Sequence, residues 1–445
     1  MSNTVIKDII PRQVLDSRGN PTVEVELILT DDSRHFASVP SGASTGKYEA
    51  VELRDSNVPN LYNGNGVLQA LINIDVMITP NLIGLDPRNQ KKIDTIIDLA
   101  DGTDNLSIVG ANAALAVSIA CTKAGAHINK IPLYQYISNI LQKEYEVQFA
   151  PNMIFPTPMV NILNGGAHAQ NNIATQEFMI VPDGISDIRE KIRASSEILH
   201  ALKTILKEKK LNTGVGDEGG YAPNLPSDQA ALEYIMRAIK KAGYEPKEEI
   251  NLALDVAISQ FFIEERKLYQ FPHQLVNDKV VTVEGTSDEL TELYINMVQK
   301  YPIISIEDGY HEDDWVGFAT LKPFMESQDK LCVGDDLTVT NTDLIEKAIK
   351  SNAINAVIIK PNQIGLVSRV FDAIKLCKEN NIKIIVSHRS GETTDTFISH
   401  LAVGSQASYL KAGGPQRGER VEKYNELMRM ITPEMARKVL NIDNS

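Results

Sequence analysis

The sequence is poor in cysteine and in positive charge. Its 445 residues include only three cysteines, Cys121, Cys332 and Cys377, which lie far apart and form no C-x-x-C pair. Such a scattered, odd set predicts buried thiols in a reducing compartment rather than a disulfide framework or a zinc site. Lysine and arginine number 44 against 58 aspartates and glutamates, which gives a formal charge of −14. Nucleic acid is therefore an unfavourable partner, because its binding requires a basic surface that displaces counterions.

Long apolar runs are also missing. The longest uncharged stretch, Asn105 to Thr122, contains Asn, Ser and Gly, whereas a membrane span needs ~20 mainly apolar residues. We expect this stretch to be a buried helix. Lys7 and Asp8 lie where a signal peptide would have its apolar core, so we expect the mature protein to begin near Met1 and to be cytoplasmic. With 43% apolar and 23% charged residues, the chain has enough apolar material for a core.

The N-terminal part predicts a small α+β domain. Val23 to Leu29 alternates apolar and charged residues, and a second extended run, Arg34 to Val39, predicts the partner strand of a hairpin. From there to about Tyr136, apolar residues recur at helical spacings. A polar segment and three prolines follow between residues 142 and 158. We therefore place the domains at residues 1–140 and 141–445.

The C-terminal part alternates short apolar runs with helical patterns such as Val367 to Glu379. Six consecutive runs end in a chemically capable residue: Asp255, Glu307, Asp335, Lys360, His388 with Arg389, and Lys411. Strands that alternate with helices predict a parallel sheet. The length and the functional strand ends favour an eight-stranded β/α barrel of the TIM type, with an open doubly wound sheet as the alternative. The predicted fold class is therefore α/β, with an α+β domain before the barrel.

Three of these strand ends carry carboxylates. Asp255, Glu307 and Asp335 would repel one another at one mouth unless a cation lay among them. Because no His or Cys accompanies them, the expected ion is Mg²⁺ rather than zinc. Lys360 and Lys411 come from the same rim, and either could act as a base if its neutral form were favoured. The alternative is that both lysines form ion pairs with the acids.

Two glycine-rich segments mimic nucleotide-binding motifs. Residues 214–219 fit G-x-G-x-x-G, but no clear strand precedes them and no helix follows, so a dinucleotide site is not predicted. Residues 42–48 are one residue short of a phosphate loop and have Tyr48 where Ser or Thr must reach the metal. We interpret the second segment as a polar loop that folds over a substrate.

Longer motifs resemble the enolase family over both predicted domains. They include LDSRGNPTVEVEL, PSGASTG, NGGAHA, QEFMIVP, GDEGGYAPN, SIED, EDDW, GDDLTVTN, KPNQIG and SHRSGET, in this order along the chain. The resemblance implies an enolase-type barrel with an N-terminal capping domain. It also implies a lyase of glycolysis, the phosphopyruvate hydratase reaction between 2-phospho-D-glycerate and phosphoenolpyruvate, with two Mg²⁺ ions per active site.

The resemblance further implies roles for individual residues. Asp255, Glu307 and Asp335 would bind the first Mg²⁺, and Ser44 would help to hold the second. Lys360 would be the base that removes the C2 proton, and Glu218 the acid that protonates the departing hydroxyl. The residues implied to orient the leaving group or to contact the substrate are Glu177, His168, Gln176, Arg389, Ser390, His388 and Lys411. Since an acid needs a raised pKa to donate near neutral pH, we expect Glu177 to raise that of Glu218.

Some positions depart from the family pattern. Gln260 replaces the usual Glu, Phe318 replaces a second Trp after EDDW, and KAGGPQRGER replaces the common K-T-G start. None of these changes removes a residue with an implied catalytic role. The family resemblance implies a homodimer or an octamer. The functional alternative is a binding or scaffold protein at the cell surface or in an RNA-processing assembly, with a secondary surface or secreted pool.

Overall fold

The computed structural model describes residues 4–42, 46–276 and 279–431, and residue contacts divide the chain into two compact units. The first unit comprises Met1–Ile154, Thr338–Glu346 and Ile358–Ala407. The second comprises Phe155–Leu337, Lys347–Val357 and Ser408–Ser445. Ser44, an expected metal ligand, lies outside the described residues.

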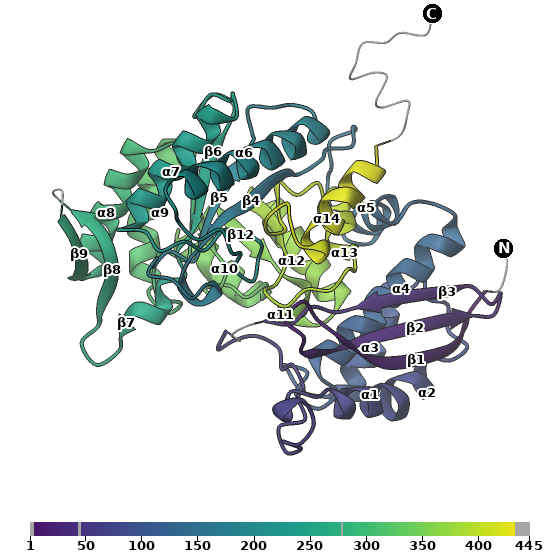
Figure 1. Ribbon diagram of the computed structural model, residues 1–445. Coiled ribbons are helices and arrows are strands. Elements are labelled where there is room, and N and C mark those ends of the chain that lie inside the picture. The colour runs from purple at the N-terminus through teal and green to yellow at the C-terminus, as the bar shows by residue number, and fades with distance from the viewer. Residues whose placement is uncertain (1–3, 43–45, 277–278, 432–445) are drawn as a thin grey trace, which may run out of the picture. The chain divides into compact units, whose positions relative to one another are not determined.

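The first unit contains an antiparallel sheet in the order β1-β2-β3, formed by β1 (Ile6–Leu15), β2 (Pro21–Leu29) and β3 (Arg34–Ser38). The predicted hairpin is confirmed, since β2 and β3 pair along their length. Strand β1 was missed because Pro11 and several charged residues interrupt its alternation. Helix α4 packs against β2 and β3 (Figure 1).

The helices and short helical turns of this unit are η1 (Tyr62–Gly64), α1 (Leu68–Asn73), η2 (Ile74–Ile78), α2 (Thr79–Leu82), α3 (Gln90–Asp101), α4 (Ala111–Asn129), α5 (Leu133–Glu144), α11 (Pro361–Ile364), α12 (Val367–Glu379) and α13 (Phe397–Gly404). Helix α4 is buried along most of its length, as predicted, but it begins at Ala111 instead of Asn105. Gly110 has a φ of 96°, which lies outside the helical region. The α12 prediction is confirmed at both ends.

A buried carboxylate joins three helices of the first unit. The carboxylate of Asp94 on α3 accepts hydrogen bonds from Ser118 Oγ on α4 at 2.7 Å and from the backbone N–H of Ser368 on α12 at 2.7 Å. Burial raises the pKa of Asp94 to about 6, because the charged form loses its hydration. This group therefore makes the packing of the three helices dependent on pH.

The predicted barrel is confirmed as a closed sheet in the order β10-β11-β12-β13-β14-β4-β5-β6. Its strands are β4 (Thr157–Asn164), β5 (Glu177–Val181), β6 (Asn251–Asp255), β10 (Ile303–Glu307), β11 (Leu331–Gly334), β12 (Ala356–Ile359), β13 (Lys383–Ser387) and β14 (Tyr409–Lys411). The prediction of a wholly parallel sheet was wrong, because β5 runs antiparallel to both β4 and β6. Residues 165–176 connect β4 to β5 and contain the short turn η3 (Gly166–His168) but no α-helix, whereas a crossover between parallel strands usually contains one.

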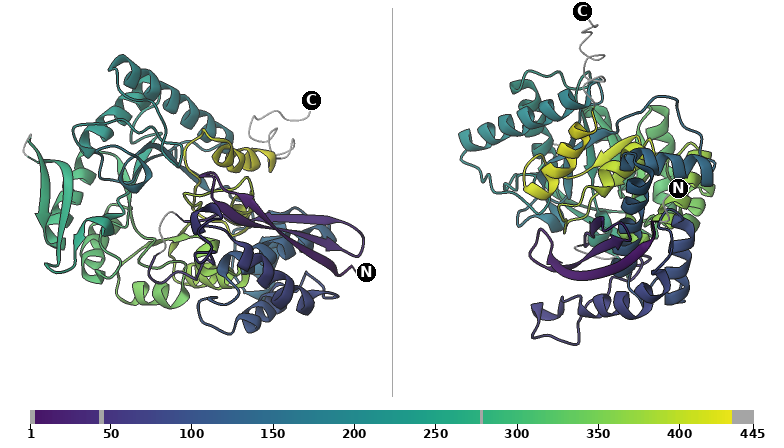
Figure 2. Two further views of the ribbon diagram at one scale, coloured as in Figure 1. Left: turned by 60° about the horizontal axis from the view of Figure 1, so that its bottom comes forward. Right: turned by 90° about the vertical axis from the view of Figure 1, so that its right-hand side faces the viewer.

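The second unit carries helices α6 (Ile188–Glu208), α7 (Asp228–Lys241), α8 (Ser287–Lys300), α9 (Trp315–Ser327) and α14 (Gly418–Arg429), and the turn η4 (Ile258–Phe261). Helix α10 (Thr342–Lys350) spans the division between the units. A separate antiparallel sheet of β7 (Phe262–Ile263), β8 (Leu268–Val276) and β9 (Lys279–Gly285) lies beside α7 and α8, at the left edge of the left view in Figure 2.

None of the helices in the described residues is long and apolar enough to cross a membrane. All three cysteines are buried free thiols, which confirms the prediction from their spacing.

Candidate active site

The buried ammonium group of Lys411 contacts three carboxylates in the second unit. Asp255 and Glu307 are the last residues of β6 and β10 and lie opposite each other in register. Lys411, the last residue of β14, places its Nζ 2.8 Å from Asp255 Oδ2, 2.9 Å from Glu307 Oε1 and 2.9 Å from Glu177 Oε1. Gln176 Nε2 donates to Asp255 Oδ2 at 3.3 Å. The four charged side chains are all buried.

These contacts bear on one of the two lysines considered from the sequence. Burial by itself lowers the pKa of Lys411, but Asp255, Glu177 and Glu307 together raise it well above its usual value. Lys411 therefore remains a cation and is unsuited to be a base. It forms the ion pairs that the sequence left as an alternative for both lysines.

Glu177, one of these three carboxylates, also lies close to Glu218 and His168. Glu177, Glu218 and His168 each offer a ligand atom within 4.8 Å of the others, and His168 Nδ1 lies 3.4 Å from Glu218 Oε2. The amide nitrogen of Asn161 donates to Glu177 Oε2 at 2.9 Å and to Glu218 Oε2 at 3.3 Å. Burial, followed by the charge of Glu218, raises the pKa of Glu177 well above its usual value, against the opposing effect of Lys411.

Three aspartates form another oxygen-rich group. Asp308, Asp335 and Asp336 each offer an oxygen within 4.8 Å of the others. Asp308 adopts a φ of 44° and accepts the backbone N–H groups of Asp335 at 3.0 Å and Asp336 at 2.9 Å. Burial, with the charges of Asp336 and Asp335, raises the pKa of Asp308 well above its usual value. Asp308 and Asp335 are buried and Asp336 is partly buried, and carboxylate oxygens that repel one another in this way fit a hard divalent cation such as Mg²⁺.

The loop that carries Glu218 is held by the segment after β14. Four consecutive carbonyls accept hydrogen bonds from this segment: Gly216 O from Arg417 at 3.2 Å, Asp217 O from Arg420 at 3.1 Å, Glu218 O from Gly414 N at 2.7 Å, and Gly219 O from Gln416 at 2.6 Å. Gly219 has a φ of 89°, and a Cβ there would lie 3.0 Å from the carbonyl oxygen of Gln416. The KAGGPQRGER departure thus lies where it fixes the backbone of a candidate acid.

The other two departures, Phe318 and Gln260, lie at separate places in the second unit. Phe318 is buried in α9, with its ring centroid 5.4 Å from that of Tyr310 in an edge-to-face contact. Gln260 lies in η4 and donates to the carbonyl of Ala257 at 3.2 Å.

Lys360 belongs to the first unit. It follows β12 and is the N-cap residue of α11, and its backbone N–H donates to Thr340 Oγ1 at 2.9 Å. The Thr340 hydroxyl in turn donates to Gln363 Oε1 at 2.9 Å. These bonds fix the backbone from which the Lys360 side chain extends.

The residues after β13 also belong to the first unit. Arg389 is buried, and its two terminal nitrogens contact both carboxylate oxygens of Glu49 at 2.9 and 3.2 Å. Asn362 Oδ1 accepts a further bond from Arg389 at 3.2 Å. His388 and Ser390 flank this arginine and are buried. A forked guanidinium of this kind is suited to phosphate as well as to carboxylate.

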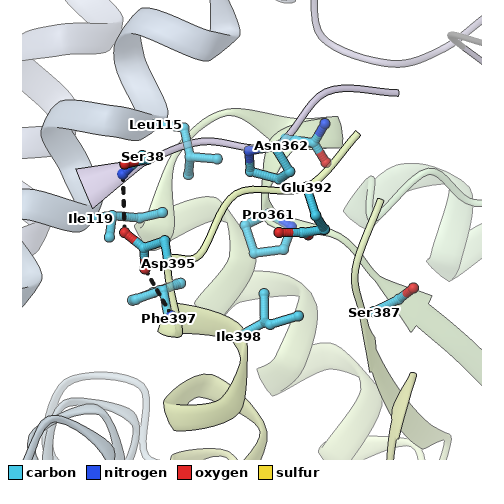
Figure 3. Close-up of a pocket in the computed structure, with 11 residues that line it drawn as sticks. Ser38, Leu115, Ile119, Pro361, Asn362, Ser387, Glu392, Asp395, Phe397 and Ile398 are labelled. Carbon is cyan, nitrogen blue, oxygen red and sulfur yellow. Dashed lines mark hydrogen bonds between the residues drawn. The ribbon is translucent and has the colours of Figure 1, made fainter. Parts of the chain in front are cut away.

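Figure 3 shows a pocket elsewhere in the first unit. Leu115, Ile119 and Phe397 line it with apolar side chains, and Asp395 on its wall accepts the backbone N–H of Ser38 at 3.0 Å. Of the site residues described above, Asn362 lines this pocket, but Lys360, Arg389 and the acidic clusters do not, so we do not place the candidate active site in it.

The residues of these clusters missed from the sequence include Asn161, Asp308, Asp336 and Glu49. Asn161 precedes the NGGAHA motif, Asp308 ends SIED, and Glu49 follows the PSGASTG loop. Asp308 could have been found, because it lies next to an expected ligand. Asn161 and Glu49 are common residue types, and only the folded structure shows what they contact.

The comparisons with known proteins cover the same parts of the chain. Residues 6–137 match the family described as the enolase N-terminal domain, and residues 152–441 match the enolase C-terminal TIM barrel domain. Curated proteins named Enolase from Ehrlichia canis (strain Jake) and Ehrlichia chaffeensis (strain Arkansas) are each 47% identical over 428 residues, which cover 96% of this chain and 96% of theirs. On these matches, and with the closed barrel and its acidic groups, this chain belongs to the enolase family.

Proposed function

We propose that this protein catalyses the reversible dehydration of 2-phospho-D-glycerate to phosphoenolpyruvate, as a lyase of glycolysis. The observation that carries the proposal is the buried pair Glu177 and Glu218 beside the ammonium of Lys411. Besides a base, an elimination from a carboxylate needs an acid that protonates the leaving group and a cation that stabilises the developing negative charge.

In the proposed reaction, the neutral amine of Lys360 removes the proton from C2 of the substrate. The electron pair left at C2 then forms the double bond to C3, and the C3 hydroxyl departs as water with a proton from Glu218. His168, Glu177 and Gln176 orient the departing hydroxyl. The charge that develops on the substrate carboxylate is stabilised by Lys411, which is fixed before the reaction by its three carboxylate contacts.

Arg389 and Ser390 are proposed to bind the substrate phosphate, with His388 beside them. The guanidinium of Arg389 contacts Glu49 through both terminal nitrogens. Phosphate is a bidentate acceptor of the same kind, so it would take the place of that carboxylate.

Two Mg²⁺ ions are proposed as cofactors. Asp255, Glu307 and Asp335 would hold the first, with Asp308 orienting Asp335, and Ser44 would contribute to the second. When bound, the ions would supply positive charge that lowers the energy of the doubly charged carboxylate intermediate.

The cellular setting is proposed from family membership. We propose a cytoplasmic homodimer or octamer whose small-molecule partners are 2-phosphoglycerate and phosphoenolpyruvate. We propose the domain boundary between residues 140 and 141, with the PSGASTG segment in the first domain and the catalytic residues and the ligands of the first Mg²⁺ in the second. No observation in the described residues favours the alternative of a surface or RNA-processing scaffold.

The test is turnover of the purified chain. With 2-phosphoglycerate and Mg²⁺, absorbance from phosphoenolpyruvate should grow, and it should stop on addition of EDTA and resume with excess Mg²⁺. Lys360→Ala should remain folded and inactive. A folded, metal-loaded wild-type protein that does not form phosphoenolpyruvate would disprove the proposal.

A further inference from the structure

We propose that Asn161 is a positioning residue that holds the Glu177 and Glu218 carboxylates in the arrangement needed for elimination. This inference rests on the proposed function. Asn161 lies on β4 and is 0% exposed. Its single amide nitrogen has two hydrogens and two acceptors, Glu177 Oε2 at 2.9 Å and Glu218 Oε2 at 3.3 Å.

The orientation of the amide follows from the charges around it. If the amide were reversed, its oxygen would face the two carboxylate oxygens, and both of the hydrogen bonds that Asn161 donates would be lost. In the observed orientation, Asn161 Oδ1 has no hydrogen-bond partner among the described residues and lies against Gly220, where a Cβ would come within 2.8 Å of it. A buried acceptor without a partner costs free energy. The two hydrogen bonds that Asn161 donates to the carboxylates offset this cost and explain the observed orientation.

The two carboxylates come from different parts of the second unit. Glu177 is the first residue of β5, whereas Glu218 lies on the loop between α6 and α7. The backbone of that loop is fixed by the segment after β14, but a glutamate side chain keeps several rotatable bonds beyond the backbone. Asn161 removes this remaining freedom on one side of Glu218, and His168 Nδ1 faces the same oxygen at 3.4 Å.

A residue that positions only the acid affects one half of the reaction. Removal of the C2 proton by Lys360 can occur and reverse without Glu218, and the reversal exchanges the C2 proton for deuterium from heavy water. Departure of the C3 hydroxyl as water requires the proton of Glu218. Loss of Asn161 should therefore slow elimination more than it slows exchange.

The test compares Asn161→Ala and Asn161→Asp with the control Asn355→Ala. Asp keeps the size of the side chain but places an acceptor where the donor was, which guards against a cavity that prevents folding. Asn355 is an asparagine of the same unit whose side chain bonds to backbone groups, accepting from Cys332 N at 2.8 Å and donating to Lys330 O at 2.8 Å. Elimination, C2 deuterium exchange and thermal unfolding are measured for each protein.

Both Asn161 variants should lose roughly 100-fold in kcat for elimination, as expected when an acid is misplaced, with KM changed less than about threefold. Exchange should fall far less, and Asn355→Ala should lower thermal stability without separating the two activities. Equal loss of exchange and elimination in the Asn161 variants, or kcat values like that of Asn355→Ala, would overturn the inference while leaving the proposed function intact. A wild-type protein that neither exchanges nor eliminates would overturn both.

Discussion

Replacing Lys411 with Met should make the stability of the protein depend strongly on Mg²⁺. The change removes one buried cation and leaves Glu177, Asp255 and Glu307 facing one another, since each lies 2.8 to 2.9 Å from the lost Nζ. At an effective dielectric constant of ~20, each such contact represents about 6 kcal/mol of gross Coulomb energy, most of which offsets desolvation. Removing one partner of a buried ion pair costs ~3–5 kcal/mol, so we expect a loss of about 4 kcal/mol in EDTA.

The metal should recover much of this loss. A divalent cation held by Asp255 and Glu307, two of these three carboxylates, would replace the missing charge and would no longer compete with an ammonium group. We therefore expect the variant to bind Mg²⁺ more tightly than the wild type does. Binding at 100 times the dissociation constant stabilises a protein by ~2.7 kcal/mol, so the gain from Mg²⁺ should exceed the wild-type gain by a measurable amount.

The assay is urea unfolding followed by circular dichroism, in EDTA and in excess Mg²⁺, with the midpoints compared at a common slope. Lys191→Met is the matched control, because Lys191 is also buried but its Nζ donates to the hydroxyl of Thr157 and forms no ion pair with a carboxylate of the described residues. Burial lowers the pKa of Lys191, so its loss should change stability by less than ~1 kcal/mol and independently of Mg²⁺. A Lys411→Met variant as stable as this control in EDTA, or a loss that Mg²⁺ does not reduce, would refute the electrostatic reasoning.

Three further predictions follow from other contacts. The pKa of Asp94 is raised to about 6 from 3.8, so the native state binds more protons than the unfolded chain between these values, and stability should fall by ~3 kcal/mol as the pH rises from about 4 to 6. Asp94→Asn should flatten that part of the pH profile of urea unfolding, and an unchanged profile would contradict the assignment. Glu49→Gln removes the carboxylate that competes with phosphate for Arg389. Inhibition by inorganic phosphate should therefore become roughly fivefold tighter, which is about 1 kcal/mol of binding free energy. Weaker inhibition would show that Glu49 assists phosphate binding. Gln416→Ala removes the donor to Gly219 O and should cost ~1 kcal/mol of stability and several-fold in kcat, and an unaltered kcat would mean that this bond does not position the acid loop.

The sequence predicts the strand ends of this fold well. Asp255, Glu307 and Lys411 end their strands, and Asp335, Lys360 and His388 follow theirs directly. Short apolar runs bounded by helical patterns are a local signal, and the carboxyl ends of parallel strands share one edge of a barrel. The position of these residues therefore needs no knowledge of the rest of the fold.

The antiparallel strand β5 explains why the pattern of apolar runs did not identify Glu177. Because β5 runs against its neighbours, Glu177 at its first residue lies opposite Asp255 at the last residue of β6. A search for capable residues at the ends of apolar runs misses a residue at the start of one. Glu177 and Gln176 were identified only through their resemblance to the family motif.

Local sequence patterns also could not predict the residue roles that depend on contacts between distant parts of the chain. The local pattern left Lys360 and Lys411 open as a base, and the three carboxylates that disfavour Lys411 come from strands far apart in the chain; Lys360 as the base stays a prediction. The expected raised pKa of Glu218 stays a prediction, while the raised pKa found in this pair belongs to Glu177. Burial sets such values, and burial is a property of the whole fold.

The most direct test of the account measures C2 deuterium exchange and phosphoenolpyruvate formation side by side in the wild type, Lys360→Met and Glu218→Gln, each loaded with Mg²⁺. The account predicts that the wild type performs both reactions, that Lys360→Met loses both, and that Glu218→Gln loses elimination but retains exchange. Exchange that survives in Lys360→Met, or elimination that survives in Glu218→Gln, would contradict the proposed division between base and acid.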